Sequence, residues 1–139
     1  MLKSWYLQNF KAIVDSGELK LAPVTVLAGR NSSGKSSLIQ SILMIAQTLG
    51  NRLPDRALLP NGPIVQLGTF EDILSEQTGL RTITIGFTLD MEKGELKETT
   101  EEWITERTDV ESVKIITQFR SSSNKEASTS AIEASKVNV

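Results

Sequence analysis

The sequence predicts an α/β protein, and three observations carry that prediction. Residues 29–36 read Gly-Arg-Asn-Ser-Ser-Gly-Lys-Ser and fit the phosphate-binding loop pattern Gly-x-x-x-x-Gly-Lys-Ser/Thr at every position. An apolar run over residues 24–28 precedes this loop and has the composition of a buried strand. Residues 37–49 follow the loop with apolar side chains at helical spacing. Such a phosphate site needs a strand, a glycine-rich loop and a helix, so we expect a mixed β-sheet around that helix.

Two strands are expected before the apolar run. Residues 2–7 have strand composition, and residues 9–11 indicate a bend. A second strand is expected around residues 13–14 or around residues 19–21. Residues 15–17, Asp-Ser-Gly, would then form a turn between these two segments.

The helix predicted over residues 37–49 has one broad apolar face. Its central stripe and the side chains that widen it are Leu38, Ile42, Ile45, Leu49, Ile39, Leu43 and Ala46. A face this broad is typical of a helix that packs on a sheet, so we expect these side chains in the core. Gly50 and Asn51 follow as the expected C-terminal cap.

Shorter elements are expected after the helix. Residues 51–63 hold three of the four prolines and predict a loop, which a short strand over residues 64–67 follows. Thr69 is expected to cap a helical turn through Leu74. Residues 81–90 alternate between apolar and polar side chains, which is typical of a half-exposed antiparallel strand. Its apolar face consists of Ile83, Ile85, Phe87 and Leu89.

The remaining sequence changes character twice. Residues 91–111 are strongly acidic and predict a solvated hairpin connection or a short helix. Residues 113–119 indicate another strand, after which the composition becomes that of a linker or a weak helix. We therefore expect a lobe that carries the phosphate loop over residues 1–119. Residues 120–139 would form a linker or the start of a further segment.

Composition excludes several classes of chemistry. The 139 residues contain no cysteine and no histidine, so disulfides, thiolate metal sites and histidine-based catalysis are excluded within this chain. The first residues lack the apolar core of a signal peptide. No apolar run approaches the roughly 20 residues of a membrane span. A cytoplasmic location is the expectation.

Charge is unevenly distributed along the chain. Residues 1–70 hold 7 basic and 3 acidic side chains, whereas residues 71–139 hold 8 basic and 14 acidic ones. The positive half contains the phosphate loop, as suits an anion site. The sequence shows no basic stripe of the kind that binds DNA, so any contact with nucleic acid is expected elsewhere or through a partner.

The residue types in the loop suit phosphate chemistry. Gly29 and Gly34 permit backbone angles that a Cβ obstructs, so the main chain can approach an anion closely. Successive N–H groups and the positive end of the following helix then bind it. Lys35 is the candidate to reach the β- and γ-phosphates, and the Ser36 hydroxyl is the candidate Mg²⁺ ligand. Further polar donors at the loop tip are Ser32 and Ser33.

Several segments resemble a known group of ATPases. They are Asn9-Phe10-Lys11, the loop with its approach over residues 26–38, and the Val-Gln-Leu-Gly-Thr-Phe segment over residues 65–70. Together they look like the N-terminal lobe of an ABC-type ATPase head, in the branch that contains RecF, SMC and the OLD-family nucleases. That branch includes bacterial "AAA family ATPases" of anti-phage operons such as Septu. The resemblance covers residues 1–90. Within the loop, Asn31 and Ser37 are typical of the branch, whereas Ser32 replaces a glycine that many relatives have.

The resemblance implies ATP and Mg²⁺ as ligands. Residues 31–37 would wrap the triphosphate, and Lys11 would lie near the nucleotide. Gln66 would sense Mg²⁺ and the γ-phosphate, or alternatively be a polar residue in an edge strand. The resemblance also implies a homodimer or higher oligomer through ATP-bound heads, with DNA or a nuclease as partner and no membrane contact. The implied pathway is anti-phage defence or DNA repair.

Parts that such a head needs are missing from the sequence. Complete heads have an apolar strand ending in Asp-Glu, which holds Mg²⁺ and polarises water. They also have a Ser-Gly loop that reaches the γ-phosphate of the opposite subunit. The nearest acidic candidate is Asp90, but its strand alternates, whereas the required strand is buried on both faces. No residue is therefore assigned as catalytic, and we expect ATP hydrolysis only when a C-terminal lobe or a partner completes the head.

Other functions share this loop. A small-molecule kinase carries it, and so does a GTPase, which would add an Asn-Lys-x-Asp motif for guanine. Asn124-Lys125-Glu126-Ala127 begins in that way but lacks the aspartate. The stronger alternative is a non-catalytic assembly module, in which bound nucleotide only stabilises a contact between proteins.

Overall fold

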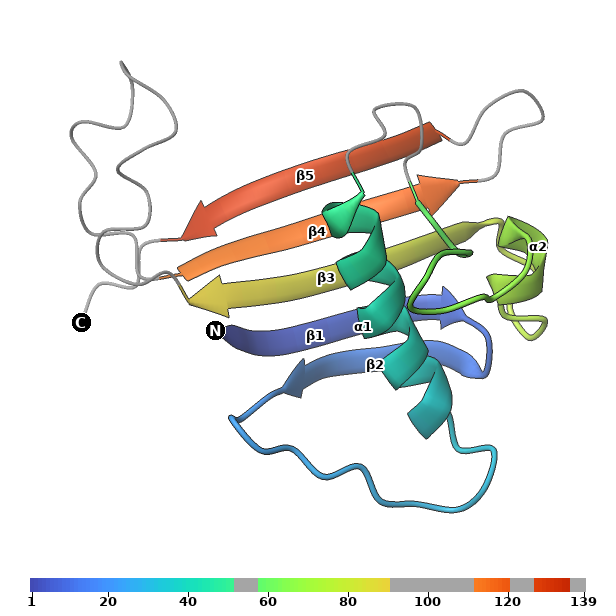
Figure 1. Ribbon diagram of the computed structural model, residues 1–139, viewed down its shortest axis with the longest axis horizontal. Helices are drawn as coiled ribbons and strands as arrows, with labels where there is room; N and C mark the ends of the chain where they lie inside the picture. The colour runs from blue at the N-terminus through green and yellow to red at the C-terminus, as the bar shows by residue number, and fades with distance from the viewer. Residues whose placement is uncertain (52–57, 91–111, 121–126, 136–139) are drawn as a thin grey trace.

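The computed structural model describes residues 1–51, 58–90 and 112–120, together with the backbone of residues 127–135. These residues form a five-stranded antiparallel sheet in the order β2-β1-β3-β4-β5, and the helix α1 crosses one face of it (Figure 1). The strands are β1 (Leu2–Phe10), β2 (Ile13–Lys20), β3 (Thr82–Asp90), β4 (Ser112–Arg120) and β5 (Ala127–Ser135). The helices of the described residues are α1 (Lys35–Gly50) and α2 (Phe70–Ile73).

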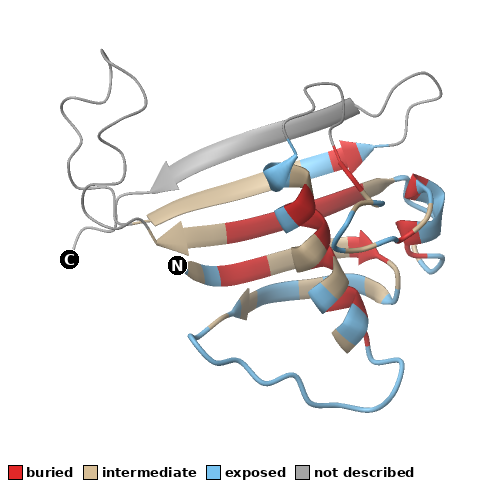
Figure 2. Ribbon diagram, viewed as in Figure 1, coloured by how far each residue is buried: buried red, intermediate tan, exposed pale blue. Residues whose placement is uncertain are grey.

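The core lies between the sheet and α1. Trp5 pairs with Phe87, and Leu7 with Ile85, where β1 and β3 run side by side. These four side chains point to the helix side of the sheet and are buried, as the alternation in the sequence predicts. The ring of Trp5 also stacks on that of Phe87, with their centroids 5.5 Å apart. Figure 2 shows the buried residues in the middle of β1 and β3 and along the adjoining side of α1.

The second strand differs from its prediction. β2 is continuous, so residues 15–17 do not form the expected turn between two segments. They form a bulge, in which the register between β1 and β2 shifts and the extra residue is accommodated. Gly17 supplies the positive φ of 60° that the bulge needs. The Ser16 hydroxyl accepts a hydrogen bond of 2.9 Å from the N–H of Leu7, which has no regular ladder partner there.

The strand predicted over residues 24–28 is wrong. No strand is assigned there, and residues 22–30 are all exposed. Val24 is 81% and Val26 82% exposed, because no described strand lies beside this segment to supply ladder hydrogen bonds. Its start is a local turn, in which the Thr25 hydroxyl bonds to both the N–H and the C=O of Ala22. The expected mixed sheet is therefore wrong as well, since the described strands pair only antiparallel.

α1 covers the predicted range and begins two residues before it, at Lys35, but the side that it buries differs from the prediction. The helix ends at Gly50 with Asn51 as its cap. Ser41 faces the sheet, where its hydroxyl accepts a buried hydrogen bond of 3.0 Å from the Trp5 indole N–H. Part of the predicted apolar face is instead solvent-exposed. Of the seven predicted core residues, Leu38 and Ile45 are buried, Ile42 and Leu43 are half-buried, and Ile39, Ala46 and Leu49 are exposed.

A buried glutamine holds the segment after α1 against the helix. The Gln47 amide donates to the carbonyl of Leu59 and, at 3.3 Å, to that of Val65, while its oxygen accepts from the N–H groups of Ile64 and Val65. The strand expected over residues 64–67 is reduced to an isolated bridge between Gln66 and Asn61. The loop predicted over residues 51–63 agrees with the described part of that range.

The helical turn predicted after Thr69 is confirmed. Thr69 and Asp72 form a capping box, in which each side chain bonds to the other residue's backbone N–H. The bond from the Thr69 N–H, together with that from its hydroxyl, lowers the pKa of the Asp72 carboxyl.

The last two strands complete the sheet. β4 confirms the strand predicted over residues 113–119. β5 pairs with it residue by residue, from Ser112 with Ser135 to Arg120 with Ala127, where the composition indicated a linker or a weak helix. The acidic residues 91–111 lie outside the described residues. The domain boundary after residue 119 stays a prediction.

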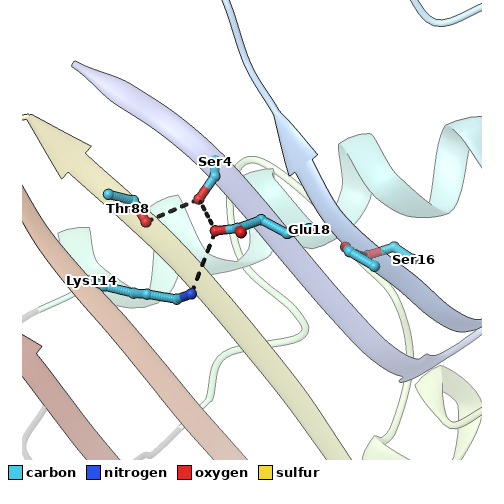
Figure 3. A network of polar contacts seen from close by, with 6 residues as sticks. Ser4, Ser16, Glu18, Thr88 and Lys114 are labelled. Atoms are coloured by element: carbon cyan, nitrogen blue, oxygen red, sulfur yellow. Dashed lines mark hydrogen bonds and ion pairs between the residues drawn. The ribbon is translucent and has the colours of Figure 1, made fainter.

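The face of the sheet away from α1 is polar. Ser4 Oγ lies 3.0 Å from Glu18 Oε1 and 2.9 Å from Thr88 Oγ1 (Figure 3). Lys114 reaches the same Glu18 oxygen at 3.5 Å from β4. This network connects side chains of β1, β2, β3 and β4. The hydrogen bond from Ser4 and then the charge of Lys114 lower the pKa of Glu18.

Candidate nucleotide-binding site

The predicted phosphate loop joins the exposed segment to the start of α1. Residues 29–33 are exposed, whereas Gly34 is buried and serves as the N-cap of the helix. Gly34 has a φ of 89°, and Ser32 has a φ of 62°, so the chain twice takes the left-handed conformation within three residues. This geometry explains why the second glycine of the pattern is needed. A loop strained in this way next to a helix start is typical of a functional site.

Lys35 ties the two ends of the loop together. Its ammonium group donates to the carbonyl of Gly29 at 2.8 Å, to that of Arg30 at 2.5 Å and to the Ser33 hydroxyl at 3.2 Å. A lysine has three N–H donors, and each has a partner here. The bond to Ser33 is the longest of the three and therefore the weakest. A phosphate oxygen could replace it at the smallest cost in hydrogen-bond energy. The ammonium group is therefore already held over the loop.

The start of α1 supplies further anion donors. The first N–H groups of a helix have no partner within it and lie at its positive end. The intrahelical ladder begins where the Leu38 N–H donates to the Gly34 carbonyl at 2.9 Å. The first turn contains no acidic side chain that would compete with a phosphate. Ser36 is exposed at this end, so its hydroxyl is accessible to a cation, whereas Ser37 is buried against the core.

Lys11 lies next to the same helix, one turn further along. It is in the turn between β1 and β2, with a φ of 48°, and its ammonium group donates to Gln40 Oε1 at 3.1 Å. Its backbone N–H donates to the Ile73 carbonyl at 2.9 Å. The structure thus places this predicted nucleotide contact beside the N-terminal half of α1. Contact with a nucleotide itself stays a prediction.

The described contacts do not bring Gln66 to the phosphate loop. Gln66 is exposed, and its neighbour Val65 is bound to Gln47. Gln47 comes eleven residues after Ser36 in the same helix, or about 16 Å along the axis at 1.5 Å per residue. Gln66 would have to move with its segment to share a cation with Ser36. Its role as a Mg²⁺ sensor stays a prediction.

The described residues supply only part of a Mg²⁺ site. Ser36 offers a hydroxyl ligand of the kind that Mg²⁺ accepts. Within the described ranges, no group of three or more acidic, cysteine or histidine side chains is placed to hold a metal. Asp90, weighed above as a magnesium ligand, forms an ion pair of 2.8 Å with Lys3 instead. The loop thus fits phosphate, while the carboxylates that would complete the cation site are not among the residues described.

Sequence reasoning missed two residues, Gln40 and Ile13, that contact the candidate site residues Lys11 and Gly34. Gln40 holds Lys11, and Ile13 packs against Gly34. The sequence did contain a signal for the role of Gln40. The helix has no charged residue after Lys35, so the amides of Gln40 and Gln47 stand out among its hydrogen-bonding side chains. The contact of Ile13 had no local signal, since 21 positions separate the two residues along the chain.

A glycine loop that leads into a helix N-terminus and is closed by its own lysine defines a P-loop nucleotide-binding protein. A family model of the AAA ATPase domain matches residues 1–138, and the chain belongs to this family. Membership confirms the ATPase part of the resemblance and supports nucleotide binding. No curated protein and no solved structure matched the chain. Among the described residues, no helix is long and apolar enough to cross a membrane.

Proposed function

We propose that this chain binds ATP with Mg²⁺ through residues 29–37, as the N-terminal lobe of an ATPase head of the RecF, SMC and OLD-type branch. The observation that carries the proposal is the contact of Lys35 with the carbonyls of Gly29 and Arg30 at the start of the loop. This contact holds a cation beside the free N–H groups of α1, where a triphosphate needs its counter-charges. Lys11, bound to Gln40 on the same helix, would supply a second cation.

The head is completed by a further polypeptide segment in this proposal. Two observations support that step. Residues 24–28 are apolar yet exposed, and the side of α1 away from the sheet carries Ile39, Ala46 and Leu49 in exposed positions. A helix that is apolar on both sides is typical of one packed between two layers. The completing segment would pair with residues 24–28 and supply the carboxylates that hold Mg²⁺ and polarise water.

The working cycle that we propose is the one implied by the resemblance to the RecF, SMC and OLD-type branch. ATP would be bound between two heads in a homodimer or higher oligomer, and hydrolysis would separate them. Closure and opening would control DNA binding or a nuclease partner, in anti-phage defence or in DNA repair. Support for the branch comes from the Asn-Phe-Lys turn, which the structure places against α1, and from the segment over residues 65–70.

A lysine substitution tests the site directly. Lys35→Ala should abolish ATP binding in isothermal titration with Mg²⁺, while circular dichroism stays that of the wild-type protein. Lys20→Ala is the matched control, because Lys20 is an exposed lysine at the end of β2. Unchanged ATP affinity in Lys35→Ala would show that the site is elsewhere. Competition by GTP in the same titration separates an ATP site from a GTPase.

A non-catalytic assembly module is the second candidate. It is supported by the exposed apolar residues of the segment over 24–28 and of α1, which offer a surface for contact with another protein. In that case nucleotide binding would stabilise a contact between proteins without turnover. Phosphate release by the purified chain, lost in Lys35→Ala, would rule this candidate out.

A further inference from the structure

Ile13, which follows the turn between β1 and β2, lies next to Gly34 of the phosphate loop. A methyl group built on Gly34 would lie 3.0 Å from Cγ1 of Ile13 and 3.5 Å from its Cδ1. The Ile13 side chain therefore occupies the space that any side chain at position 34 would need. Ile13 is half-buried and packs against the core cluster, so its position is set by the sheet rather than by solvent.

The position of this turn is itself fixed by strong constraints. Asn9 and Lys11 both have left-handed backbone angles, with φ of 59° and 48°. Such angles are unfavourable for residues other than glycine and persist only where surrounding contacts hold them. Asn9 is fully buried, and its amide donates to the carbonyls of Leu80 at 2.9 Å and Thr82 at 2.8 Å.

The same turn is bound on its other side to the segment around α2. The Lys11 N–H donates to the Ile73 carbonyl at 2.9 Å, and Phe10 forms a bridge with Leu74. Hydrogen bonds to two separate segments thus hold the turn. Ile13 is the first residue of β2 and comes immediately after this turn. Because the turn is held in place, Ile13 is a rigid support for Gly34.

We infer that Ile13 is a positioning residue for the phosphate loop. It sets the place of Gly34, and with it the direction of the N–H groups at the start of α1, without touching the nucleotide. Hydrogen bonds weaken steeply with distance and angle, so a small displacement of Gly34 lowers the affinity for phosphate. This inference rests on the proposed function, and it assigns to the first residue of β2 a part in setting the affinity for phosphate.

The test compares truncations at neighbouring positions in the full chain. Ile13→Ala removes the atoms that contact Gly34, whereas Val14→Ala truncates the next residue, which is 42% exposed, and is the matched control. Isothermal titration with ATP and with inorganic tripolyphosphate gives the readout. We expect Ile13→Ala to lower the affinities for both ligands by a similar factor of about tenfold. A change of this size is common for coupling between distinct sites. Val14→Ala and the conservative Ile13→Val should bind both ligands as the wild-type protein does.

A merely structural role predicts a different result. It would lower the midpoint of thermal unfolding for Ile13→Ala and leave the affinity of the folded protein for tripolyphosphate unchanged, which would overturn the inference. If Ile13→Ala does not fold, Ile13→Leu is measured instead, because it keeps the side-chain volume but moves the branch from Cβ to Cγ and so changes the atoms that face Gly34. Weaker binding of both ligands by the folded Ile13→Leu protein supports the inference, and wild-type binding overturns it.

The two proposals fail in distinguishable ways. Absence of ATP binding in the wild-type protein, or unchanged binding in Lys35→Ala, refutes the proposed function. Loss of binding in Lys35→Ala together with wild-type affinity in Ile13→Ala refutes only the role of Ile13.

Discussion

The indole N–H of Trp5 donates to the hydroxyl of Ser41 at 3.0 Å, which joins the first strand to the helix that follows the phosphate loop. Both residues are buried, and the Ser41 hydroxyl donates a hydrogen bond of 2.7 Å to the carbonyl of Leu38. Ser41 thus lies on the side of α1 that faces the sheet, while Ile39, Ala46 and Leu49 occupy exposed positions of the helix.

Ser41→Ala should destabilise the protein by about 1–3 kcal/mol, because the buried indole N–H loses its acceptor. Urea unfolding followed by circular dichroism measures the change. Ala46→Ser, at an exposed position of the same helix, is the control and should have little effect. Equal stability of Ser41→Ala and the wild-type protein would mean that the indole finds another partner.

Gln47→Leu should release the segment after α1. The substitution leaves the backbone groups of Leu59, Ile64 and Val65 without their partner, at about 1–3 kcal/mol for each group that stays buried and unsatisfied. Faster amide hydrogen exchange at Val65 would report the release. Gln47→Glu keeps the acceptor and loses the donors, so we expect an intermediate effect on exchange. Unchanged exchange in Gln47→Leu would contradict the role of this amide.

Val26→Asp should separate the stability of this chain from assembly of the complete head. Val26 is 82% exposed, so we expect the unfolding free energy of the chain to change by no more than about 0.5 kcal/mol. In the complete head, the same charge would be placed between paired strands, and ATP turnover should be lost. Lys20→Ala again serves as the exposed control. A large destabilisation of the chain itself would mean that Val26 is already packed.

Stability should depend on the ionisation of Glu18. Its pKa is lowered in the folded protein by the hydrogen bond from Ser4 and the charge of Lys114. A lowered pKa means that the contribution is complete above the ordinary glutamate value of about 4.3 and is lost as the pH falls through the folded value. The stability difference between the wild-type protein and Glu18→Gln should therefore shrink on acidification. Glu76→Gln, an exposed site outside the network, is the control, and a difference independent of pH would contradict the prediction.

The local sequence predicted the candidate phosphate loop and several elements. The loop pattern predicted Lys35 and the two glycines as phosphate-binding residues, because their chemistry depends on spacing over eight consecutive residues. Alternation predicted β3, and apolar spacing with the Gly50-Asn51 cap predicted the extent of α1 to within two residues. The capping box at Thr69 was equally local. In each case the signal and the structure involve the same few neighbouring residues.

Tertiary structure decided what depends on partners distant in the chain. Residues 24–28 have strand composition but no neighbouring strand to pair with, so they remain exposed. Ser41 accepts a hydrogen bond from the Trp5 indole on the sheet side of α1, whereas Leu49 of the same helix is exposed. The contact of Ile13 with Gly34 and the bond of Lys11 to Gln40 likewise required β1, β2 and α1 to be packed together. A sequence pattern specifies the conformation that a segment prefers, whereas burial and pairing depend on which other segments fold against it.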